Sequence, residues 1–200
     1  MILIYAVFER LVWLATFIVT RLFVSFKVIG RENLAGLNRP AMIISNHRTF
    51  FDPLIIGTLF PFFSRYLPIA FMVDDRYYFN PILRLFFKLT QTFPSYYGQG
   101  LAVSLKSPRQ VLKSGGVFLI FPTGQRHSGG PRPKPKRGAA VLAIEMPRLD
   151  ILPVYLRVSK NSRQKIMAAI GRPFKLADIT SSRDLAAVAD LLAERIYELM

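Results

Sequence analysis

The sequence predicts a single α/β domain with a central mixed sheet of about six or seven strands, helices on both faces and a membrane-associated helix at the N-terminus. Short, continuous apolar runs at 67–73 and 117–121 are typical of buried strands. Other segments carry helix start signals, such as Asn80 followed by Pro81. The 200 residues are 52% hydrophobic, which is enough to build one substantial core.

The N-terminal segment 1–26 is predicted to be a helix that associates with a membrane. Its longest uncharged run, 11–20, is too short to cross about 30 Å of hydrocarbon. At helical spacing its polar side chains gather on one side and leave a broad apolar face that includes Trp13; they are Glu9, Arg10, Thr16, Thr20 and Arg21. We expect a helix that lies in the bilayer interface or inserts only shallowly. A core helix of a soluble domain is the alternative interpretation.

The sheet is expected to begin after this helix. A short strand at 27–31 and a polar loop at 33–40 precede the apolar run at 41–44, which is typical of a strand. A very apolar helix is predicted at 54–63, with Pro61 near its end.

The second half of the chain is predicted to alternate between helices and strands. We expect helices at 79–89, 107–114, 138–146 and 183–200, and strands at 117–121, 151–158 and 164–170. Three prolines alternate with basic residues in the segment 127–137, which therefore forms an exposed loop. The last helix is expected to be purely structural, because it is amphipathic.

A histidine and a carboxylate stand close together after the run at 41–44. Asp52 is the single carboxylate between Asn33 and Val73, and it follows His47 by five positions. A histidine accepts a proton near neutral pH when a carboxylate orients its ring. Because five positions separate two side chains around a continuous helix, a tight turn is needed to bring this pair together. The alternative is that Asp52 only caps a helix and His47 only packs.

Four short segments occur in the order and approximate spacing of a known family. They are Asn46-His47 with Asp52-Pro53, the strand and turn at 117–126, Lys136-Arg137-Gly138-Ala139-Ala140, and Ile151-Leu152-Pro153-Val154. Together they span about 27–174 and resemble the glycerolipid acyltransferase family, whose best-known members are the 1-acylglycerol-3-phosphate acyltransferases. Order and spacing are harder to match by chance than any single motif.

The resemblance implies that 27–200 is an acyltransferase domain. Its reaction would move a fatty acyl group from an acyl thioester, either acyl-CoA or acyl carrier protein, to a hydroxyl of a lysophospholipid such as 1-acyl-glycerol-3-phosphate. His47 would be the general base, and Asp52 would orient it. The implied substrate-binding residues are Thr123, Gly124, Gln125, Arg126 and Lys136.

The same resemblance implies a location and a set of partners. We expect the bacterial inner membrane with an active site that faces the cytoplasm, where acyl thioesters are made. No cofactor is expected, and no cluster of acids and histidines in the sequence suggests a metal site. Backbone amides near Gly124, or at the helix start after Asp52, are expected to stabilise the tetrahedral oxyanion.

Two departures from the family pattern leave the acceptor open. Thr123 stands where the family has a glutamate, and Gln125 stands where it has a threonine. No lysine or arginine lies between Lys88 and Lys106, where the family places a basic residue that meets the acceptor's phosphate. A different lysolipid or an aminoacyl-lipid acceptor is therefore an alternative. A non-catalytic module that binds anionic lipid is a second alternative.

Charge and cysteine content exclude several other functions. The net charge is +15, and the stretch 76–144 contains eleven lysines and arginines but no acidic residue. This half is expected to attract an anionic membrane surface, a phosphorylated substrate or an acidic carrier protein, whereas the motif order argues against nucleic acid. The absence of cysteine excludes disulfides and a cysteine nucleophile. Ser45, on an extended strand two residues before His47, is poorly arranged to attack as a nucleophile.

Overall fold

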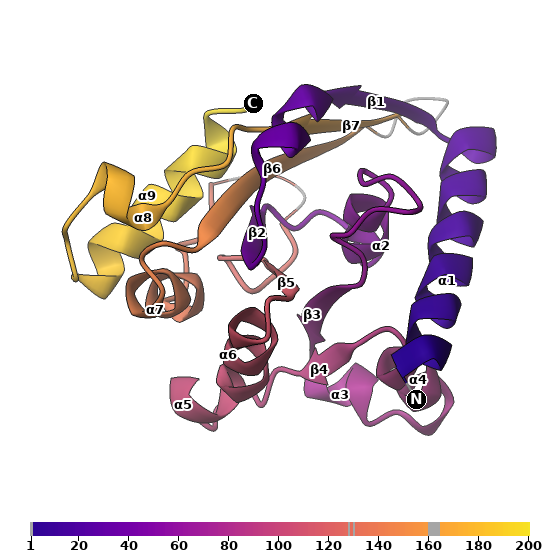
Figure 1. Ribbon diagram of the computed structural model, residues 1–200, viewed down its shortest axis with the longest axis horizontal. Helices are drawn as coiled ribbons and strands as arrows, with labels where there is room; N and C mark the ends of the chain where they lie inside the picture. The colour runs from indigo at the N-terminus through magenta and orange to yellow at the C-terminus, as the bar shows by residue number, and fades with distance from the viewer. Residues whose placement is uncertain (1, 128, 130, 160–164) are drawn as a thin grey trace.

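The chain folds around a seven-stranded mixed sheet with the strand order β1-β7-β6-β2-β5-β3-β4 (Figure 1). This computed structural model describes residues 2–127, 129, 131–159 and 165–200. All neighbouring strands are parallel except β6 and β7, which run antiparallel. The predicted fold class, a single α/β domain with a mixed sheet of about six or seven strands, is confirmed.

Each of the first five strands is followed by one or two helices, the sixth strand is followed by the seventh, and two helices come last. The strands are β1 (Ser25–Ile29), β2 (Ala41–Ser45), β3 (Ile69–Val73), β4 (Thr92–Pro94), β5 (Val117–Ile120), β6 (Asp150–Ser159) and β7 (Lys165–Ile170). The helices are α1 (Ile2–Phe23), the 3-10 helix η1 (Arg31–Gly36), α2 (Asp52–Gly57), α3 (Asp75–Tyr78), α4 (Pro81–Leu89), α5 (Leu101–Ser104), α6 (Lys106–Lys113), α7 (Gly138–Glu145), α8 (Leu176–Ile179) and α9 (Leu185–Tyr197).

Both faces of the sheet are buried, because successive side chains of a strand point to opposite faces. On β2, Met42 and Ile44 join a core cluster that contains side chains of α6, α7 and α9. Ala41 and Ile43 point the other way and join a second cluster, which includes Ile56 of α2. This double burial explains why the strands are continuous apolar runs in the sequence.

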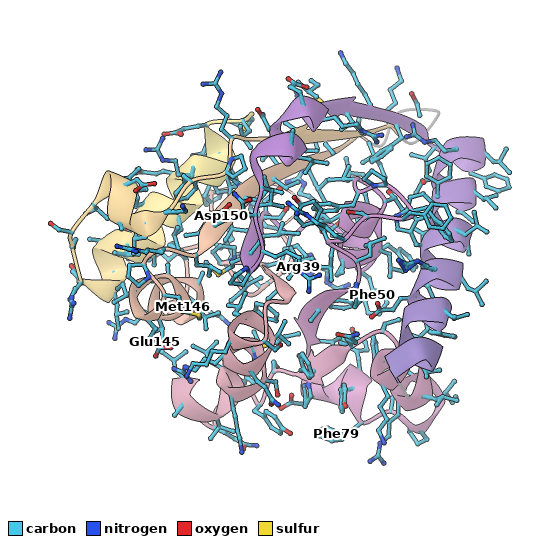
Figure 2. All side chains as sticks on the ribbon, viewed as in Figure 1. Arg39, Phe50, Phe79, Glu145, Met146 and Asp150 are labelled. Carbon is cyan, nitrogen blue, oxygen red and sulfur yellow. The ribbon has the colours of Figure 1, made fainter. Side chains whose placement is uncertain are left out.

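The sheet register brings the segment with His47 and the turn that follows β5 together at one edge of the sheet. Ala41 of β2 pairs with Val117 of β5, and these strands run parallel, so the loops that follow them leave the same edge of the sheet. At the opposite edge, Arg39 (Figure 2) donates hydrogen bonds to the carbonyls of Gly115 (2.7 Å) and Arg65 (2.6 Å). The carboxyl edge of a parallel sheet is where open α/β folds place their ligands.

Some predicted boundaries differ from the structure. The strand expected at 27–31 begins two residues earlier, as Ser25–Ile29, and part of the expected polar loop at 33–40 is the 3-10 helix η1. The helix expected at 54–63 begins at Asp52 and ends at Gly57, because the amide of Thr58 closes the last turn and no regular helix follows before Pro61. Apolar content alone does not fix where a helix stops.

Helix α1 packs toward the domain with a mixed side that carries Glu9, Trp13 and Thr16. The Trp13 indole Nε1 donates a hydrogen bond to the Gly57 carbonyl of α2 at 2.9 Å, and α1 lies beside α2 and α4 (Figure 1). Several apolar side chains on its other side are exposed, among them Leu22 and Phe23 at 69% and 70%. This exposure argues against a core helix, the alternative interpretation. Within the part of the chain that the structure describes, no helix is both long enough and apolar enough to cross a bilayer.

Glu9 is the one carboxyl on the inward side of α1. Both of its carboxyl oxygens are buried, and the described residues offer them no hydrogen-bond partner. It faces a small pocket between α1 and the domain, with Leu54 and Phe71 in its wall. Burial raises the pKa of Glu9 to about 8 from its ordinary value of 4.5, and the nearby Arg10 cation only partly opposes this increase.

This raised pKa predicts that the protein loses stability as the pH rises. Between about pH 4.5 and pH 8 the folded chain holds a proton on Glu9 that the unfolded chain releases, so the free energy of unfolding falls by up to about 1.4 kcal/mol per pH unit. Glu9→Gln keeps the shape but cannot ionise. Its unfolding temperature should therefore exceed that of the parent at pH 8, and the difference should shrink at pH 5. An equal difference at both pH values would contradict the assignment.

Candidate active site

The chain leaves the sheet at a point that is fixed by Asn46. The buried Asn46 side chain donates to the Leu156 carbonyl at 2.8 Å and accepts from the Leu156 amide at 2.7 Å. These two bonds attach the end of β2 to β6, so His47 begins its loop from a rigid position. Sequence reasoning quoted Asn46 as part of the motif but assigned it no role. A buried amide that pairs with a distant backbone gives no local signal.

Asp52 collects four hydrogen bonds within the loop between β2 and α2. Its Oδ2 atom accepts from His47 Nδ1 at 2.8 Å, from the Thr49 amide at 2.9 Å and from the Arg48 amide. Its Oδ1 atom accepts from the Thr49 hydroxyl at 2.6 Å. The carboxylate is fully buried, and these four donors fix its position. The predicted tight turn therefore does bring His47 and Asp52 together.

The expectation that Asp52 caps the following helix is wrong. Asp52 is the first residue of α2, Pro53 follows it, and Phe51 occupies the cap position without a side-chain hydrogen bond. The carboxylate turns back to the loop, because the Arg48 and Thr49 amides and His47 all point at it. The alternative interpretation, in which Asp52 only caps and His47 only packs, is thereby excluded.

The His47 ring is held by Phe121 as well as by Asp52. The two rings stack with centroids 4.1 Å apart and an angle of 12° between their planes. The His47 side chain stays 18% exposed. With Nδ1 bonded to Asp52, the remaining ring nitrogen, Nε2, is the one that can accept a proton from a substrate. Ser45 is fully buried and donates to the Asn46 carbonyl, so it is not placed as a nucleophile.

A turn after β5 forms the second wall of the site. The Gly124 amide donates to the Phe121 carbonyl at 2.8 Å, and the Thr123 hydroxyl donates to the Gln125 carbonyl at 3.1 Å. Thr123 is buried, and this bond of its hydroxyl closes the turn. The His127 amide donates to the His47 carbonyl at 2.8 Å, which ties this turn to the histidine. Because the Gly124 amide is already bonded, it is not available to an oxyanion.

The other predicted binding residues of the turn are exposed. Gln125 and Arg126 both face solvent, and no carboxylate of the described residues lies within ion-pair distance of Arg126. The Lys136 side chain crosses the turn next to Gly124, and its backbone amide donates to the Pro122 carbonyl at 2.7 Å. All five residues predicted to bind substrate therefore lie on one loop system beside His47.

The segment that departs from the family pattern forms a short strand and a fixed loop. β4 pairs with β3 at the end of the sheet, and the loop after it is held by Asp75. The Asp75 carboxylate accepts from the Tyr96 amide at 2.7 Å and from the Tyr97 amide at 3.1 Å. Tyr96 adopts a left-handed backbone conformation, with φ of 48°, which these bonds support.

Helix α9 also reaches the loop beside the site, which the sequence did not predict. The Arg132 guanidinium lies 4.2 Å above the Tyr197 ring. Burial raises the pKa of Tyr197, and the charges of Arg132 and Arg48 oppose the increase. The Arg48 guanidinium in turn donates to the His127 carbonyl at 3.0 Å. The end of α9 thus contacts the loop that carries Arg132, in addition to its role in the core.

The bonding of Asp52 predicts a large effect on stability. Asp52→Ala leaves the partly buried Arg48 and Thr49 amides without an acceptor, and each such loss costs about 1–3 kcal/mol when the group is shielded from water. We expect the free energy of unfolding in urea to fall by roughly 2 kcal/mol or more. Asp52→Asn, which keeps an acceptor oxygen, should lose clearly less. Equal losses in the two variants would show that the loop does not depend on these bonds.

The fold and the motifs have counterparts among known proteins. The family model described as acyltransferase matches residues 25–157. The 1-acyl-sn-glycerol-3-phosphate acyltransferase of Bacillus subtilis (strain 168) is 27% identical over 182 residues, which cover 86% of this chain and 87% of that relative. The crystal structure of the 1-acyl-sn-glycerophosphate (LPA) acyltransferase PlsC from Thermotoga maritima superposes with a TM-score of 0.67 and 20% sequence identity. The superposition covers 98% of this chain and 79% of that chain, and it supports the fold. The chain therefore belongs to the acyltransferase family, as the resemblance in its sequence predicted.

Proposed function

We propose that the chain moves a fatty acyl group from an acyl thioester to a hydroxyl of a lysophospholipid of the 1-acyl-glycerol-3-phosphate type. The observation that carries this proposal is the 2.8 Å contact between His47 Nδ1 and the fully buried Asp52 carboxylate, in a chain of the acyltransferase family. The relative from Bacillus subtilis is named for a reaction on this class of acceptor. The product would enter phospholipid biosynthesis.

The proposed reaction needs one base and no acyl-enzyme. The acceptor hydroxyl gives its proton to His47 Nε2 as its oxygen attacks the thioester carbonyl carbon. Asp52 stabilises the imidazolium that forms, because its position is fixed by donors other than His47. The tetrahedral intermediate collapses, the carbon–sulfur bond breaks, and the imidazolium returns the proton to the leaving thiolate. No step uses a metal or a cofactor.

The acyl donor in this proposal is acyl-CoA or acyl carrier protein. Both carry the thioester on a phosphopantetheine arm, and acyl carrier protein is acidic overall. Arg126, Arg132 and Lys134 are exposed on the loop beside His47 and provide positive charge for either donor. The oxyanion would be stabilised at the start of α2, since the Gly124 amide is occupied.

We also propose that the enzyme works on a membrane surface, through what we call the apolar flank. This flank consists of the outward side chains of α1 and two neighbouring side chains; its main members are Leu11, Ile18, Leu22, Phe23, Phe63 and Ile82. Phe63 and Ile82 are 85% and 87% exposed, which is costly in water for side chains of this size. With a net charge of +15, the chain would favour an anionic leaflet, such as the cytoplasmic face of a bacterial inner membrane.

Replacement of the proposed base tests the reaction directly. His47→Ala should lower the rate of acyl transfer to 1-acyl-glycerol-3-phosphate by about 10²–10⁴-fold, because general-base catalysis contributes that much. Labelled acyl donor and mass analysis of the product provide the measurement. The variant should remain folded, with a lower unfolding temperature because Asp52 loses one of its four donors, and it should still sediment with anionic vesicles. A variant that transfers at the parent rate would leave a non-catalytic lipid-binding module as the better description.

Replacement of two side chains on the apolar flank tests the membrane proposal. Leu22→Ser combined with Phe23→Ser should weaken partitioning to anionic vesicles by about tenfold or more, since each large side chain contributes about 1.5–3 kcal/mol when it leaves water. Val103→Ser on α5, away from α1 in Figure 1, is the matched control and should sediment like the parent. Unchanged sedimentation of the double variant would show that the flank does not contact lipid.

A further inference from the structure

Two arginines from separate loops come together at the end of α9. The Arg132 guanidinium lies 4.2 Å from the centre of the Tyr197 ring, which is a cation–π distance. The Arg48 guanidinium donates to the His127 carbonyl at 3.0 Å. Burial raises the pKa of Tyr197, and the charges of Arg132 and Arg48 both oppose this increase, so both cations lie near the same phenol. We call Arg48 and Arg132 the arginine pair.

The charges of the arginine pair are not neutralised by the part of the chain that the structure describes. No carboxylate of those residues lies within 4.0 Å of either guanidinium. Glu198, which follows Tyr197 in the chain, is paired with Arg195 at 3.2 Å. Arg48 is half-buried, so water screens its charge only in part. Two neighbouring cations without a carboxylate repel each other, and an external anion would relieve that repulsion.

The arginine pair is connected directly to the proposed base. Arg48 follows His47 in the chain. His127, whose carbonyl holds the Arg48 guanidinium, donates from its own amide to the His47 carbonyl at 2.8 Å. The arginine pair and the histidine therefore share one edge of the sheet and one set of backbone contacts. An anion on the pair would belong to a molecule that also reaches His47.

The arginine pair lies at the end of a helix that packs on the sheet face away from the apolar flank. Helix α9 supplies Val188, Leu192 and Ile196 to the core cluster on one face of the sheet. Helix α1 instead contacts α2, whose Ile56 belongs to the cluster on the other face. Figure 1 shows α9 and α1 on opposite sides of the molecule. A lipid would arrive from the apolar flank, so an anion at α9 fits the water-soluble substrate, which is the acyl donor.

We propose that Arg48 and Arg132, the latter held over Tyr197, bind the phosphate of the donor's phosphopantetheine arm. This inference rests on the proposed function and gives its donor a binding site. Acyl-CoA and acyl carrier protein share this phosphate, and planar guanidinium groups bind phosphate oxygens through paired hydrogen bonds. The phosphate of the acceptor has the same chemistry, so the experiment separates the two substrates.

The test compares two acyl donors that differ only in this phosphate, acyl-4′-phosphopantetheine and acyl-pantetheine. In Arg48→Ala combined with Arg132→Ala, the KM for the phosphorylated donor should rise about 10- to 100-fold, as expected for loss of charge-assisted hydrogen bonds. The KM for acyl-pantetheine and the KM for 1-acyl-glycerol-3-phosphate should stay at the parent values. Arg132→Ala alone, which removes no bond to the backbone, should show a smaller rise of the same kind. An equal rise with both donors, or a rise for the acceptor alone, would overturn the assignment.

Arg31→Ala combined with Lys113→Ala is the matched control for net charge. Arg31 follows β1, which runs opposite to β2, and Lys113 ends α6 just before β5 begins. Both exposed cations therefore lie at the edge of the sheet away from His47, and this variant should have the parent KM for both donors. If it raised the KM for the phosphorylated donor as much as loss of the arginine pair does, the effect would be general electrostatics, and the inference would be wrong.

A binding measurement keeps this inference separate from the proposed reaction. 4′-Phosphopantetheine and pantetheine are titrated by calorimetry into the parent and into the variant that lacks the arginine pair. The parent should bind the phosphorylated compound about tenfold or more tightly than pantetheine, and the variant should lose this difference. If the parent transfers no acyl group to any lysolipid, the proposed function fails, yet this titration still tests the arginine pair. A parent that binds the two compounds equally would overturn the inference even where transfer persists.

Discussion

The site depends on the placement of one buried carboxylate. Asp52 is fully buried, and a buried ionised group is tolerated only when hydrogen-bond donors surround it. The loop after β2 supplies those donors from the backbone of Arg48 and Thr49, from a hydroxyl and from the His47 ring. The same bonds that make the carboxylate acceptable in the interior therefore orient the His47 ring. The stability of the loop and the orientation of the proposed base are two consequences of one arrangement.

The remaining contacts of the site extend this arrangement to the loop where substrate would bind. Phe121 covers the His47 ring, and the turn that follows it is bonded back to the histidine backbone. Lys136 then connects that turn to the Tyr97 loop. His47 and the turn after β5 are thus linked through direct contacts, which limits their relative movement. Such positional control is what lets an enzyme hold a hydroxyl against an incoming thioester.

Helix α2 connects the site to the outer surface. It begins with Asp52 and ends with Gly57, whose carbonyl accepts the hydrogen bond of Trp13 in α1. The apolar flank therefore lies only one helix away from the Asp52 carboxylate. Phe51, directly before Asp52, is itself 60% exposed. This proximity fits an enzyme whose proposed acceptor is a lipid, because such a substrate would move from bilayer to base over a short path.

The sequence by itself determined the fold class and the composition of the strands, and it predicted that His47 and Asp52 meet. Strands buried on both faces leave continuous apolar runs, and the His47-to-Asp52 spacing permits only a turn, so both features are local enough to recognise. The pairing of Asn46 with Leu156, the stacking of Phe121 and the reach of Lys136 to Tyr97 were decided only by the tertiary structure. Each joins segments that are far apart in sequence, and their contact depends on sheet register and loop paths. The side of α1 that meets the domain, with Glu9 and Trp13, was also decided by the tertiary structure, since helical periodicity separates two faces but does not say which one packs inward.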